Sequence, residues 1–523
     1  MKPLFPYKSA TATVIRAMSA AQTSGFLMTM LAVAACNPNS SRAANPARQS
    51  SRRPNFVFFL ADDMGWRDAG CYGSTFYETP NIDRLAKQGM RFADAYAACP
   101  VCSPTRASIM TGKYPARLGT TDYFGAPQPD TVSRHWTRNK PLLPAPYLDH
   151  LPLEEATVAK ALRQGGYSTY FAGKWHLGGR GYWPEDQGFD INIGGWAAGM
   201  PSSYFSPYKN PKLPDGPKGE HLDDRLAAES IKFLQHVGRE PFLLYHAFYS
   251  VHIPLQAKQD LIGKYEAKRE QVTNEGPLFR PEGDRQARQV QEHAVYAAMI
   301  ETMDRSVGRI LDALDRLGLA DSTVVFFMSD NGGLSTAEGA PTSNLPLRAG
   351  KGWLYEGGIR EPMIVKWPGV TRAGSTSNTP VISTDFYPTM LEMAGLPAKP
   401  EQHVDGVSLV PLLRQTGSTV ARAIYWHYPH YGNQGGSPGS AVRIGDWKLI
   451  EFFEDHRLEL YNLKNDLGEQ HNLAVEQGKR AAGLHEKLKA WRAAVGARMP
   501  SPNPNRQVGG RESESILSFV ADD

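Results

Sequence analysis

Two unbroken apolar runs, far apart in the chain, place the strongest constraint on the fold. They are residues 55–61 (NFVFFLA) and residues 323–329 (TVVFFMS). Because they lack the alternation of a strand with one solvated face, they are typical of strands buried on both faces, as in a parallel sheet under helices. The oxygen-bearing side chains that follow the two runs are Asp62 and Asp63, and Asp330 and Asn331. Since ligands bind at the carboxyl ends of strands in open α/β sheets, these pairs predict a ligand site.

Helix and strand patterns alternate between and after these runs, which predicts an α/β fold. A long apolar stripe predicts a helix at residues 293–317. Further helices are predicted at residues 81–88 and 154–164, and further strands at residues 91–96, 168–172, 241–249 and 363–367. Residues 258–288 are charged and lack a clear period, so we expect a surface insertion there. The expected architecture is a large, mostly parallel sheet flanked by helices.

The pattern changes to short strands near the C-terminus. Strands are predicted at residues 423–428, 440–444, 447–453 and 458–462, and a terminal helix at residues 476–495. This order indicates a smaller α+β domain with a short antiparallel sheet. We therefore expect a main domain at residues 54–415, a C-terminal subdomain at residues 416–500 and a polar tail at residues 501–523.

The N-terminal segment is typical of an export signal. Residues 1–36 carry three basic residues and no acid, and the apolar run at residues 25–35 is too short to span a bilayer. Residues 33–36 (VAAC) resemble the lipobox of bacterial lipoproteins, which predicts a lipid on Cys36 and a location in the periplasm or at the outer membrane. Cleavage without lipid would instead give a soluble secreted form. A flexible tether is expected at residues 37–53.

Residues 102–113 (CSPTRASIMTGK) form a second informative stretch. Pro104 suits the first turn of a helix and Gly112 suits the left-handed position after its last turn, so a helix is expected to begin just past Cys102. Cys102 would then lie where free backbone N–H groups and the helix dipole favour an anion. Arg106 would lie on the same face. The alternative is a small buried cysteine before a short helix.

The two oxygen-bearing pairs offer only hard ligand atoms. Without His or Cys among them, they suit Ca²⁺ or Mg²⁺ better than Zn²⁺. The alternative is that these side chains only cap turns. Adjacent acidic residues buried without a cation would repel each other, however, and this favours a metal site.

Several basic side chains follow predicted strands or lie in glycine-rich loops. They are Arg106, Lys174, His176, His252 and Lys351. Each could be a solvated lysine or a satisfied core histidine. Their expected position on the side of the acidic pairs favours a functional site instead.

The stretch at residues 102–113 resembles the signature of the sulfatase family, Cys-x-Pro-x-Arg followed by Thr-Gly-Lys. Three more motifs resemble elements of the same family: residues 173–178 (GKWHLG), 251–254 (VHIP) and 350–358 (GKGWLYEGG). The resemblance runs from residue 55 to about residue 472. It implies an alkaline-phosphatase-like α/β fold and a sulfuric ester hydrolase, with no departure at a catalytic position.

The resemblance also implies a modified residue and a metal ion. In this family a maturation enzyme oxidises the signature cysteine, so Cys102 is expected to become formylglycine. The implied ligands of Ca²⁺ are Asp62, Asp63, Asp330 and Asn331, completed by an oxygen of the modified Cys102 and by the substrate. With Cys36 and Cys102 assigned, Cys71 and Cys99 are the only possible disulfide pair, which an exported protein could form; we expect both to be free or without a role in function.

The resemblance further implies a role for each side chain. The hydrated aldehyde at residue 102 would lose a proton to Asp330 and attack sulfur, with Ca²⁺ as Lewis acid. Because charge moves onto the leaving oxygen, the site needs cations and an acid. The cations that hold the sulfate would be Arg106, Lys174 and Lys351. His252 would donate a proton to the leaving alcohol, and His176 would help to expel sulfate.

The substrate is less constrained by the sequence. Export and aromatic loops at residues 196–208 and 426–431 favour a sulfated carbohydrate, because aromatic rings stack on sugar faces. The same aromatic residues could equally be ordinary packing. Two other functions stay open: a phosphoester hydrolase of the same superfamily, usually with a two-zinc site, and a catalytically inactive glycan-binding relative.

The expected partners follow from these predictions. They are a sulfated carbohydrate, the formylglycine-generating enzyme, and a membrane only through the lipid on Cys36. The formal net charge of +4, without a basic stripe interleaved with aromatic residues, gives no case for nucleic acid.

Overall fold

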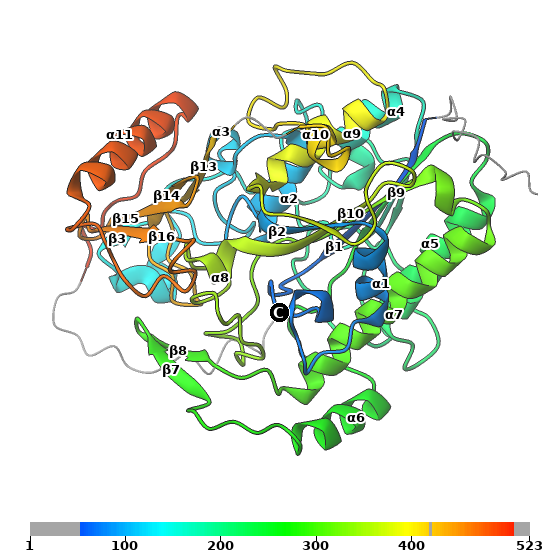
Figure 1. The fold of residues 1–523 in the computed structure, drawn as a ribbon, viewed down its shortest axis with the longest axis horizontal. Coiled ribbons are helices and arrows are strands. Elements are labelled where there is room, and N and C mark those ends of the chain that lie inside the picture. The colour runs from blue at the N-terminus through cyan, green and yellow to red at the C-terminus, as the bar shows by residue number, and fades with distance from the viewer. Residues whose placement is uncertain (1–52, 418–420, 507–523) are drawn as a thin grey trace, which may run out of the picture. The chain divides into compact units, whose positions relative to one another are not determined.

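The central sheet of the computed structural model has nine strands within the described residues, which are 53–417 and 421–506. Its order is β11-β2-β10-β9-β1-β6-β4-β5, with β12 also paired to β2 (Figure 1). The strands are β1 (Asn55–Ala61), β2 (Met90–Tyr96), β4 (Ser168–Gly173), β5 (Ile191–Ile193), β6 (Phe242–Ala247), β9 (Thr323–Ser329), β10 (Arg360–Lys366), β11 (Ser375–Ser377) and β12 (Val381–Ile382). Only β10 runs antiparallel to its neighbours, β2 and β9. The predicted mostly parallel sheet is confirmed.

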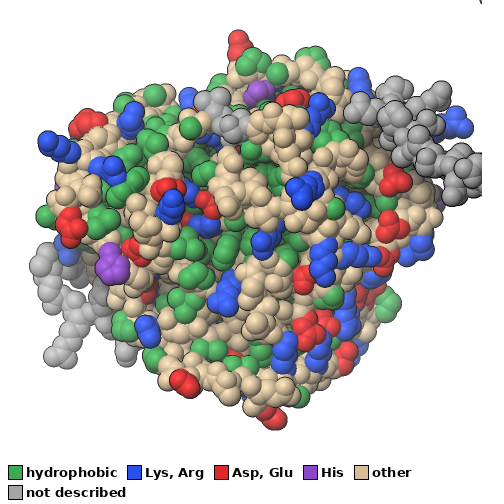
Figure 2. Space-filling view, in the orientation of Figure 1, with side chains coloured by type: hydrophobic (Ala, Val, Ile, Leu, Met, Phe, Trp, Pro, Cys, Tyr) green, Lys and Arg blue, Asp and Glu red, His purple; other side chains and the backbone are tan. Residues whose placement is uncertain are grey.

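Helices cover both faces of this sheet (Figure 1). One face packs against α1 (Pro80–Gln88), α5 (Leu222–His236), α6 (Gln259–Arg269) and α7 (Ala294–Arg316), and the other against α2 (Cys102–Thr111), α4 (Val158–Gln164), α9 (Phe386–Met393) and α10 (Val410–Leu413). Side chains of β1 alternate between the two cores, with Phe59 on the first face and Phe58 on the second. This burial on both faces explains the unbroken apolar run. Acidic and basic side chains are interspersed over α1 and α7 on the face shown in Figure 2. Arg84 of α1 and Asp312 of α7 form an ion pair, with Nη1 2.8 Å from Oδ1.

The register of the strands brings the polar strand ends together. β1 and β9 pair in phase from Asn55–Thr323 to Ala61–Ser329, so the residues that follow both strands leave the sheet side by side. On the other side of β1, Leu60 pairs with Ala247 of β6, and Ala247 pairs with Gly173 of β4. The loops after β1, β9, β6 and β4 therefore start at one edge.

A separate antiparallel sheet follows near the C-terminus, as predicted. It has the order β13 (Ala423–Tyr428), β14 (Gly439–Ile444), β15 (Trp447–Phe452) and β16 (Leu458–Asn462). One face packs on α11 (Gly478–Val495) through Leu449 and Leu488, and the other packs Trp426 and Ile450 near Tyr96. All described residues belong to one compact unit, Arg52–Asp523, so the boundary at residues 415/416 stays a prediction.

Three elements differ from the prediction. The helix predicted at residues 154–164 begins only at Val158, because the Thr157 side chain accepts a hydrogen bond from the Lys160 N–H and caps it. The insertion at residues 258–288 contains α6 and a hairpin of β7 (Phe279–Glu282) and β8 (Arg285–Arg288). The predicted tail starts with β17 (Ser501–Pro502), which pairs with β3 (Leu142–Leu143). The remaining helices are α3 (Pro115–Leu118) and α8 (Glu356–Ile359).

Several predictions fall outside the described residues. These are the signal peptide at residues 1–36 with its lipid on Cys36, nearly all of the tether, and the tail from residue 507. Within residues 53–417 and 421–506, none of the helices has the length and apolar character needed to cross a bilayer. Cys71, Cys99 and Cys102 are free thiols in this part of the chain, as expected for the first two.

A substitution at Gly173 would test how closely β4 approaches β6. Its φ is +100°, and a Cβ there would lie 1.8 Å from the Ala247 carbonyl oxygen. We expect Gly173→Ala to lower the free energy of unfolding by about 3 kcal/mol or more, because backbone would have to move. Gly166→Ala is the control: φ is +83° but no described atom lies within 4 Å of the new Cβ, so only backbone strain of about 1–2 kcal/mol is added. Equal losses in urea unfolding would contradict the steric argument.

Candidate active site

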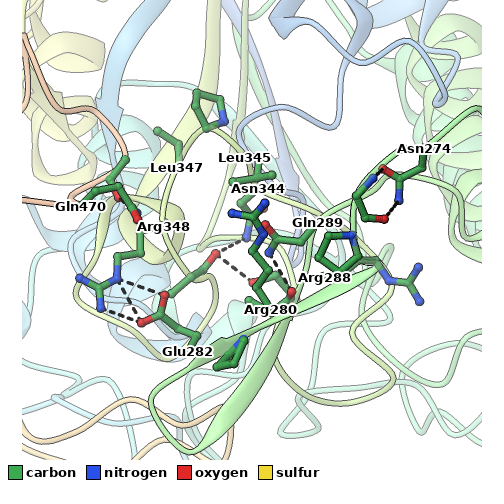
Figure 3. Close-up of a pocket in the computed structure, with 18 residues that line it drawn as sticks. Asn274, Arg280, Glu282, Arg288, Gln289, Asn344, Leu345, Leu347, Arg348 and Gln470 are labelled. Atoms are coloured by element: carbon green, nitrogen blue, oxygen red, sulfur yellow. Dashed lines mark hydrogen bonds and ion pairs between the residues drawn. The ribbon is translucent and has the colours of Figure 1, made fainter.

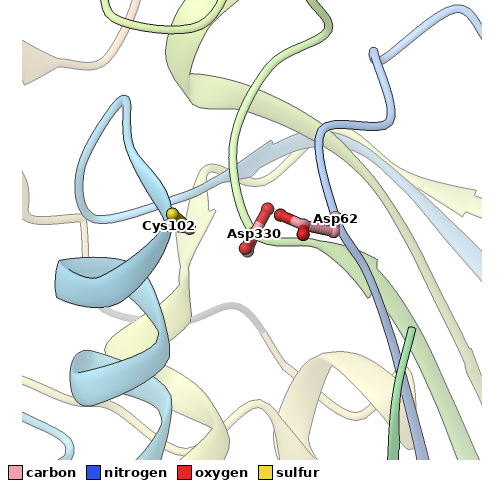
Figure 4. A group of neighbouring side chains, drawn as sticks. All are labelled: Asp62, Cys102 and Asp330. Atoms are coloured by element: carbon pink, nitrogen blue, oxygen red, sulfur yellow. The ribbon is translucent and has the colours of Figure 1, made fainter. Parts of the chain in front are cut away.

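Cys102 lies at the start of α2, opposite the ends of two central strands. It is the first residue of the helix, one position earlier than predicted, and Gly112 with φ +69° ends it as expected. Asp62 follows β1 and Asp330 follows β9, and both side chains point toward Cys102 (Figure 4). One ligand atom of each of these three residues lies within 4.8 Å of the other two. The structure therefore brings together the signature helix and the two acidic pairs.

Arg106 joins the helix to the acidic residues. Its Nε and Nη2 both lie 2.7 Å from Asp330 Oδ2, and its Nη1 donates to the Lys174 carbonyl oxygen at 2.8 Å. Nη2 is also 3.6 Å from Asp62 Oδ1. A single buried guanidinium thus fixes the positions of three loops.

Two lysines pair with the first acidic pair. Lys174 Nζ lies 2.6 Å from Asp62 Oδ2, and Lys351 Nζ lies 2.8 Å from Asp63 Oδ2. The Asn331 side-chain amide donates to Asp63 Oδ1 at 2.8 Å, and the Asp63 N–H donates to Asp330 Oδ1 at 3.2 Å. Every acid of the site therefore has a cationic or amide partner.

His176 contacts the cysteine directly. Its Nε2 lies 3.0 Å from the Phe124 carbonyl oxygen, which can only accept, so Nε2 carries the hydrogen and Nδ1 is free to accept. Nδ1 lies 3.4 Å from Cys102 Sγ. The Phe124 N–H donates to Ser103 Oγ, which ties this carbonyl to α2. Burial, together with the charge of Lys174, lowers the pKa of His176 well below its usual value, so the ring is neutral.

His252 lies on the side of Asp63. Its Nε2 is 3.6 Å from Asp63 Oδ2, and its Nδ1 is 3.0 Å from the Ile253 carbonyl oxygen. Burial and the charge of Lys351 lower the pKa of His252 to about 4. One ring nitrogen, an Asp63 oxygen and a carboxylate oxygen of Glu338 lie within 4.8 Å of one another. Glu338 was missed by the sequence analysis, because it belongs to none of the motifs.

The predicted basic residues are buried, which excludes the solvated alternative for the lysines. Their exposed fractions are 0% for Lys174, 4% for Lys351, 5% for His176 and 8% for His252. Burial alone would lower the pKa of Lys351, but the nearby acidic groups, Asp63 and Glu338 foremost, together outweigh it and raise the pKa well above its usual value. Burial would likewise raise the pKa of Asp63, but Lys351 and His252 hold that pKa below its usual range. Both groups are therefore charged.

The acidic pairs fit a hard divalent cation. Among the described residues, Asp62 Oδ1 and Asn331 Oδ1 are buried without a hydrogen-bond partner. Burial, and the nearby charges of Asp330 and Asp63, also raise the pKa of Asp62 well above its usual value despite Lys174. Unpaired buried oxygens beside converging carboxylates are what a Ca²⁺ ion would satisfy.

A cavity of about 540 Å³ lies between the β7–β8 hairpin and the loop at residues 344–349 (Figure 3). Arg348 and Glu282 form an ion pair in its lining, with Nη2 2.8 Å from Oε1. None of the predicted site residues is in the described lining of this cavity. The chemistry therefore belongs to the strand ends and not to this hollow.

Comparisons with known proteins agree with this site. A family model described as Sulfatase matches residues 54–396, and one described as N-sulphoglucosamine sulphohydrolase, C-terminal, matches residues 349–494. A protein of Formosa agariphila named Sulfatase is 32% identical over 520 residues, which cover 85% of this chain and 89% of that protein. The N-acetylgalactosamine-6-sulfatase of Rattus norvegicus is 33% identical over 420 residues, covering 76% of this chain and 71% of the relative. The solved structure of Ps i-CgsB in complex with k-i-k-neocarrahexaose has a TM-score of 0.69 and 29% identity, and the match covers 84% of this chain and 93% of that one.

A substitution at Arg106 would test how much the stability of the site depends on its guanidinium group. We expect Arg106→Lys to lower the free energy of unfolding by about 2–4 kcal/mol, because a lysine keeps the charge but loses the paired contact with Asp330 and the bond to the Lys174 carbonyl. Arg117→Lys is the matched control. Arg117 binds Asp405 through two 2.8 Å contacts but is a third exposed, so its replacement should cost about 1 kcal/mol or less. The measurement is chemical unfolding; similar losses for both variants would contradict this assignment.

Proposed function

Because this chain belongs to the sulfatase family and is a sulfuric ester hydrolase, we propose that it removes sulfate from a sulfated carbohydrate, using a formylglycine made from Cys102 and a bound Ca²⁺. The convergence of Cys102, Asp62 and Asp330 within 4.8 Å carries this proposal. The maturation enzyme that oxidises the cysteine is then a required partner. Export and a lipid on Cys36 are part of the same proposal, supported by the basic and apolar pattern of residues 1–36.

The state of Cys102 supports its modification. The side chain is 3% exposed, and burial raises the pKa of its thiol. Because a protonated thiol is a poor nucleophile, unmodified cysteine is poorly suited to attack here. A hydrated formylglycine would supply a nucleophilic hydroxyl and a second one for release of the sulfate.

The remaining residues have roles that follow from their positions. Ca²⁺, when bound, supplies Lewis-acid polarisation of the sulfate. It would be held by Asp62, Asp63, Asp330 and Asn331. Asp330, in reach of Cys102, would accept a proton from the nucleophile. The sulfate would be bound by Arg106, Lys174 and Lys351. His252 would donate a proton to the leaving alcohol, which requires that the negative charge of the bound substrate raise its pKa from about 4. His176, next to Cys102, would assist release of sulfate.

A carbohydrate substrate is supported by the relatives more than by the aromatic loops. Similar proteins are named for N-acetylgalactosamine 6-sulfate, and the Ps i-CgsB structure contains k-i-k-neocarrahexaose. Most aromatic residues of the two loops are packing: Trp426, Tyr428, Tyr204 and Tyr208 are at most 2% exposed. Trp196 and Tyr431 are half-buried and are the better candidates for sugar contact.

Assays can distinguish the proposed sulfatase from two alternatives, a phosphoester hydrolase and a glycan-binding protein without activity. A phosphoester hydrolase with a two-zinc site would need His ligands, whereas the oxygens near Cys102 come from Asp and Asn side chains. Release of phosphate but not sulfate from matched monoesters would favour it. Tight binding of sulfated glycans without turnover would favour a glycan-binding role.

Cys102 can be tested chemically. Mass spectrometry of the peptide containing residue 102, from protein produced with the maturation enzyme, should show formylglycine. Cys102→Ala should lower sulfate release from sulfated saccharides by about 10³-fold or more with an unchanged melting temperature. Cys71→Ala should keep full activity, because Cys71 lies in the short 3₁₀ helix Gly70–Tyr72 and its backbone binds Asp83 and Arg91, which are not residues of the site. Full activity with an unmodified thiol would overturn the mechanism.

Calcium binding can be tested without turnover. Wild-type protein stripped with EGTA should gain thermal stability when Ca²⁺ is added, by about 2.7 kcal/mol at a hundredfold excess over Kd. Asn331→Ala should weaken Ca²⁺ binding, measured by calorimetry, by about tenfold or more. Asn465→Ala, at an exposed turn, should bind like wild type. Equal Ca²⁺ affinity in Asn331→Ala would remove this residue from the ligand set.

A further inference from the structure

Glu338 lies in the catalytic centre, but none of the predicted roles uses it. One of its carboxylate oxygens is within 4.8 Å of a His252 ring nitrogen and of an Asp63 oxygen. Its charge also acts on Lys351 and on the half-buried Tyr123. Residues 331–344 of the loop that carries it are buried except at residues 337–339. Glu338 therefore sits where the site opens.

The carboxylate is held from one side only. Oε1 accepts hydrogen bonds from Asn433 Nδ2 and from Gln434 Nε2, both at 2.8 Å. Oε2 is buried, with no hydrogen-bond partner in the part of the chain that the structure describes. An unpaired buried acceptor costs about 1–3 kcal/mol, so this oxygen is available to accept from a donor outside the chain.

The backbone around Glu338 is strained. Three consecutive residues have positive φ: +55° at Glu338, +85° at Gly339 and +40° at Ala340. A positive φ is unfavourable for the two non-glycine residues, Glu338 and Ala340. The conformation persists because hydrogen bonds around the loop hold it. The Ala340 N–H donates to the Ala337 carbonyl at 2.7 Å, and Arg288 Nε donates to the Ala340 carbonyl. Strain kept at the mouth of a site points to a functional constraint.

The charge of Glu338 excludes a role in binding the sulfate itself. A carboxylate repels a sulfate group, and Arg106, Lys174 and Lys351 already provide the cations. Glu338 lies beside His252, the proposed proton donor, and therefore on the side of the leaving alcohol. On that side it would face the sugar that carries the sulfate.

We propose that Glu338 is a specificity-determining residue that recognises the substituent of the sugar lying nearest in space to the sulfate that is removed. Its carboxylate accepts a hydrogen bond from a hydroxyl or N–H group there, and it disfavours sugars that carry a second sulfate or a carboxylate at that position. This inference rests on the proposed function, because it assumes a sulfated carbohydrate. The physical basis is the same as in other sites that discriminate by a buried acceptor: a matching donor is bound and an anion is repelled.

The test compares Glu338→Gln with wild type on substrates that differ beside the sulfate. The probes are N-acetylgalactosamine 4-sulfate, 6-sulfate and 4,6-disulfate, the three galactose counterparts, and p-nitrophenyl sulfate, which has no neighbouring hydroxyl. We expect kcat/KM for the accepted monosulfated sugar to fall about tenfold, and that for the disulfated sugar to rise by a similar factor relative to it. Hydrolysis of p-nitrophenyl sulfate should stay within about threefold of wild type.

Two further variants separate specificity from structure. Asn433→Ala leaves the carboxylate but loosens it, and it should shift the same ratio in the same direction by less. Glu292→Gln removes a carboxylate that pairs with Arg288, and it should leave all substrates unchanged.

The outcomes are distinct. An unchanged ratio of disulfated to monosulfated sugar in Glu338→Gln, or an equal loss on p-nitrophenyl sulfate, would overturn the inference alone. A wild-type enzyme that hydrolyses p-nitrophenyl sulfate but none of the sugars would overturn the carbohydrate proposal, and this inference with it.

Discussion

The in-phase pairing of β1 with β9 is the constraint on which the active site depends. Because side chains alternate along a strand, a slip of one residue would turn the large side chains of β1 to the wrong face. Both faces are already filled, with Phe56 and Phe58 in one core and Phe59 in the other. The packing of the strand therefore fixes the register. The register in turn places Asp62 beside Asp330, as neither residue could do by its own interactions.

Charge pairing explains how several ionised groups can lie together in the buried active site. Each buried acid of the two pairs has a basic partner: Lys174 for Asp62, Lys351 for Asp63 and Arg106 for Asp330. Burying an unpaired charge would cost several kcal/mol, so these pairs make the fold tolerable without a ligand. The oxygens left over, on Asp62 and Asn331, are the part of the site that the chain does not satisfy by itself. Stability and ligand binding thus use different atoms of the same residues.

Sequence patterns predicted what depends on local order, and missed what depends on contacts across the chain. The strands with their acidic ends were recognisable because burial on both faces leaves a continuous apolar run. Helix α6 was not recognisable from the sequence, because its buried side chains, Leu261 and Tyr265, are too few to form an apolar stripe. Glu338 was missed because its place depends on amides almost a hundred residues away. The aromatic loop at residues 426–431 was ambiguous for a related reason: Trp426 donates to the Ala97 carbonyl, a contact no local pattern encodes.

The C-terminal sheet holds the loops of the active site in position. Lys448 of β15 is fully buried and pairs with Glu356 at 3.0 Å and with Glu469 at 2.9 Å. Glu356 begins α8, at the end of the loop that carries Lys351, and its N–H donates to Glu469 Oε2. Removing the sheet would take Lys448 away from the buried Glu356. Breaking a buried ion pair in this way costs several kcal/mol of stability. The same C-terminal region supplies the amides that hold Glu338. The loops on both sides of Lys351 therefore take their positions from a C-terminal sheet that contributes none of the residues proposed to bind metal or sulfate, so changes in that sheet can alter the site without touching it.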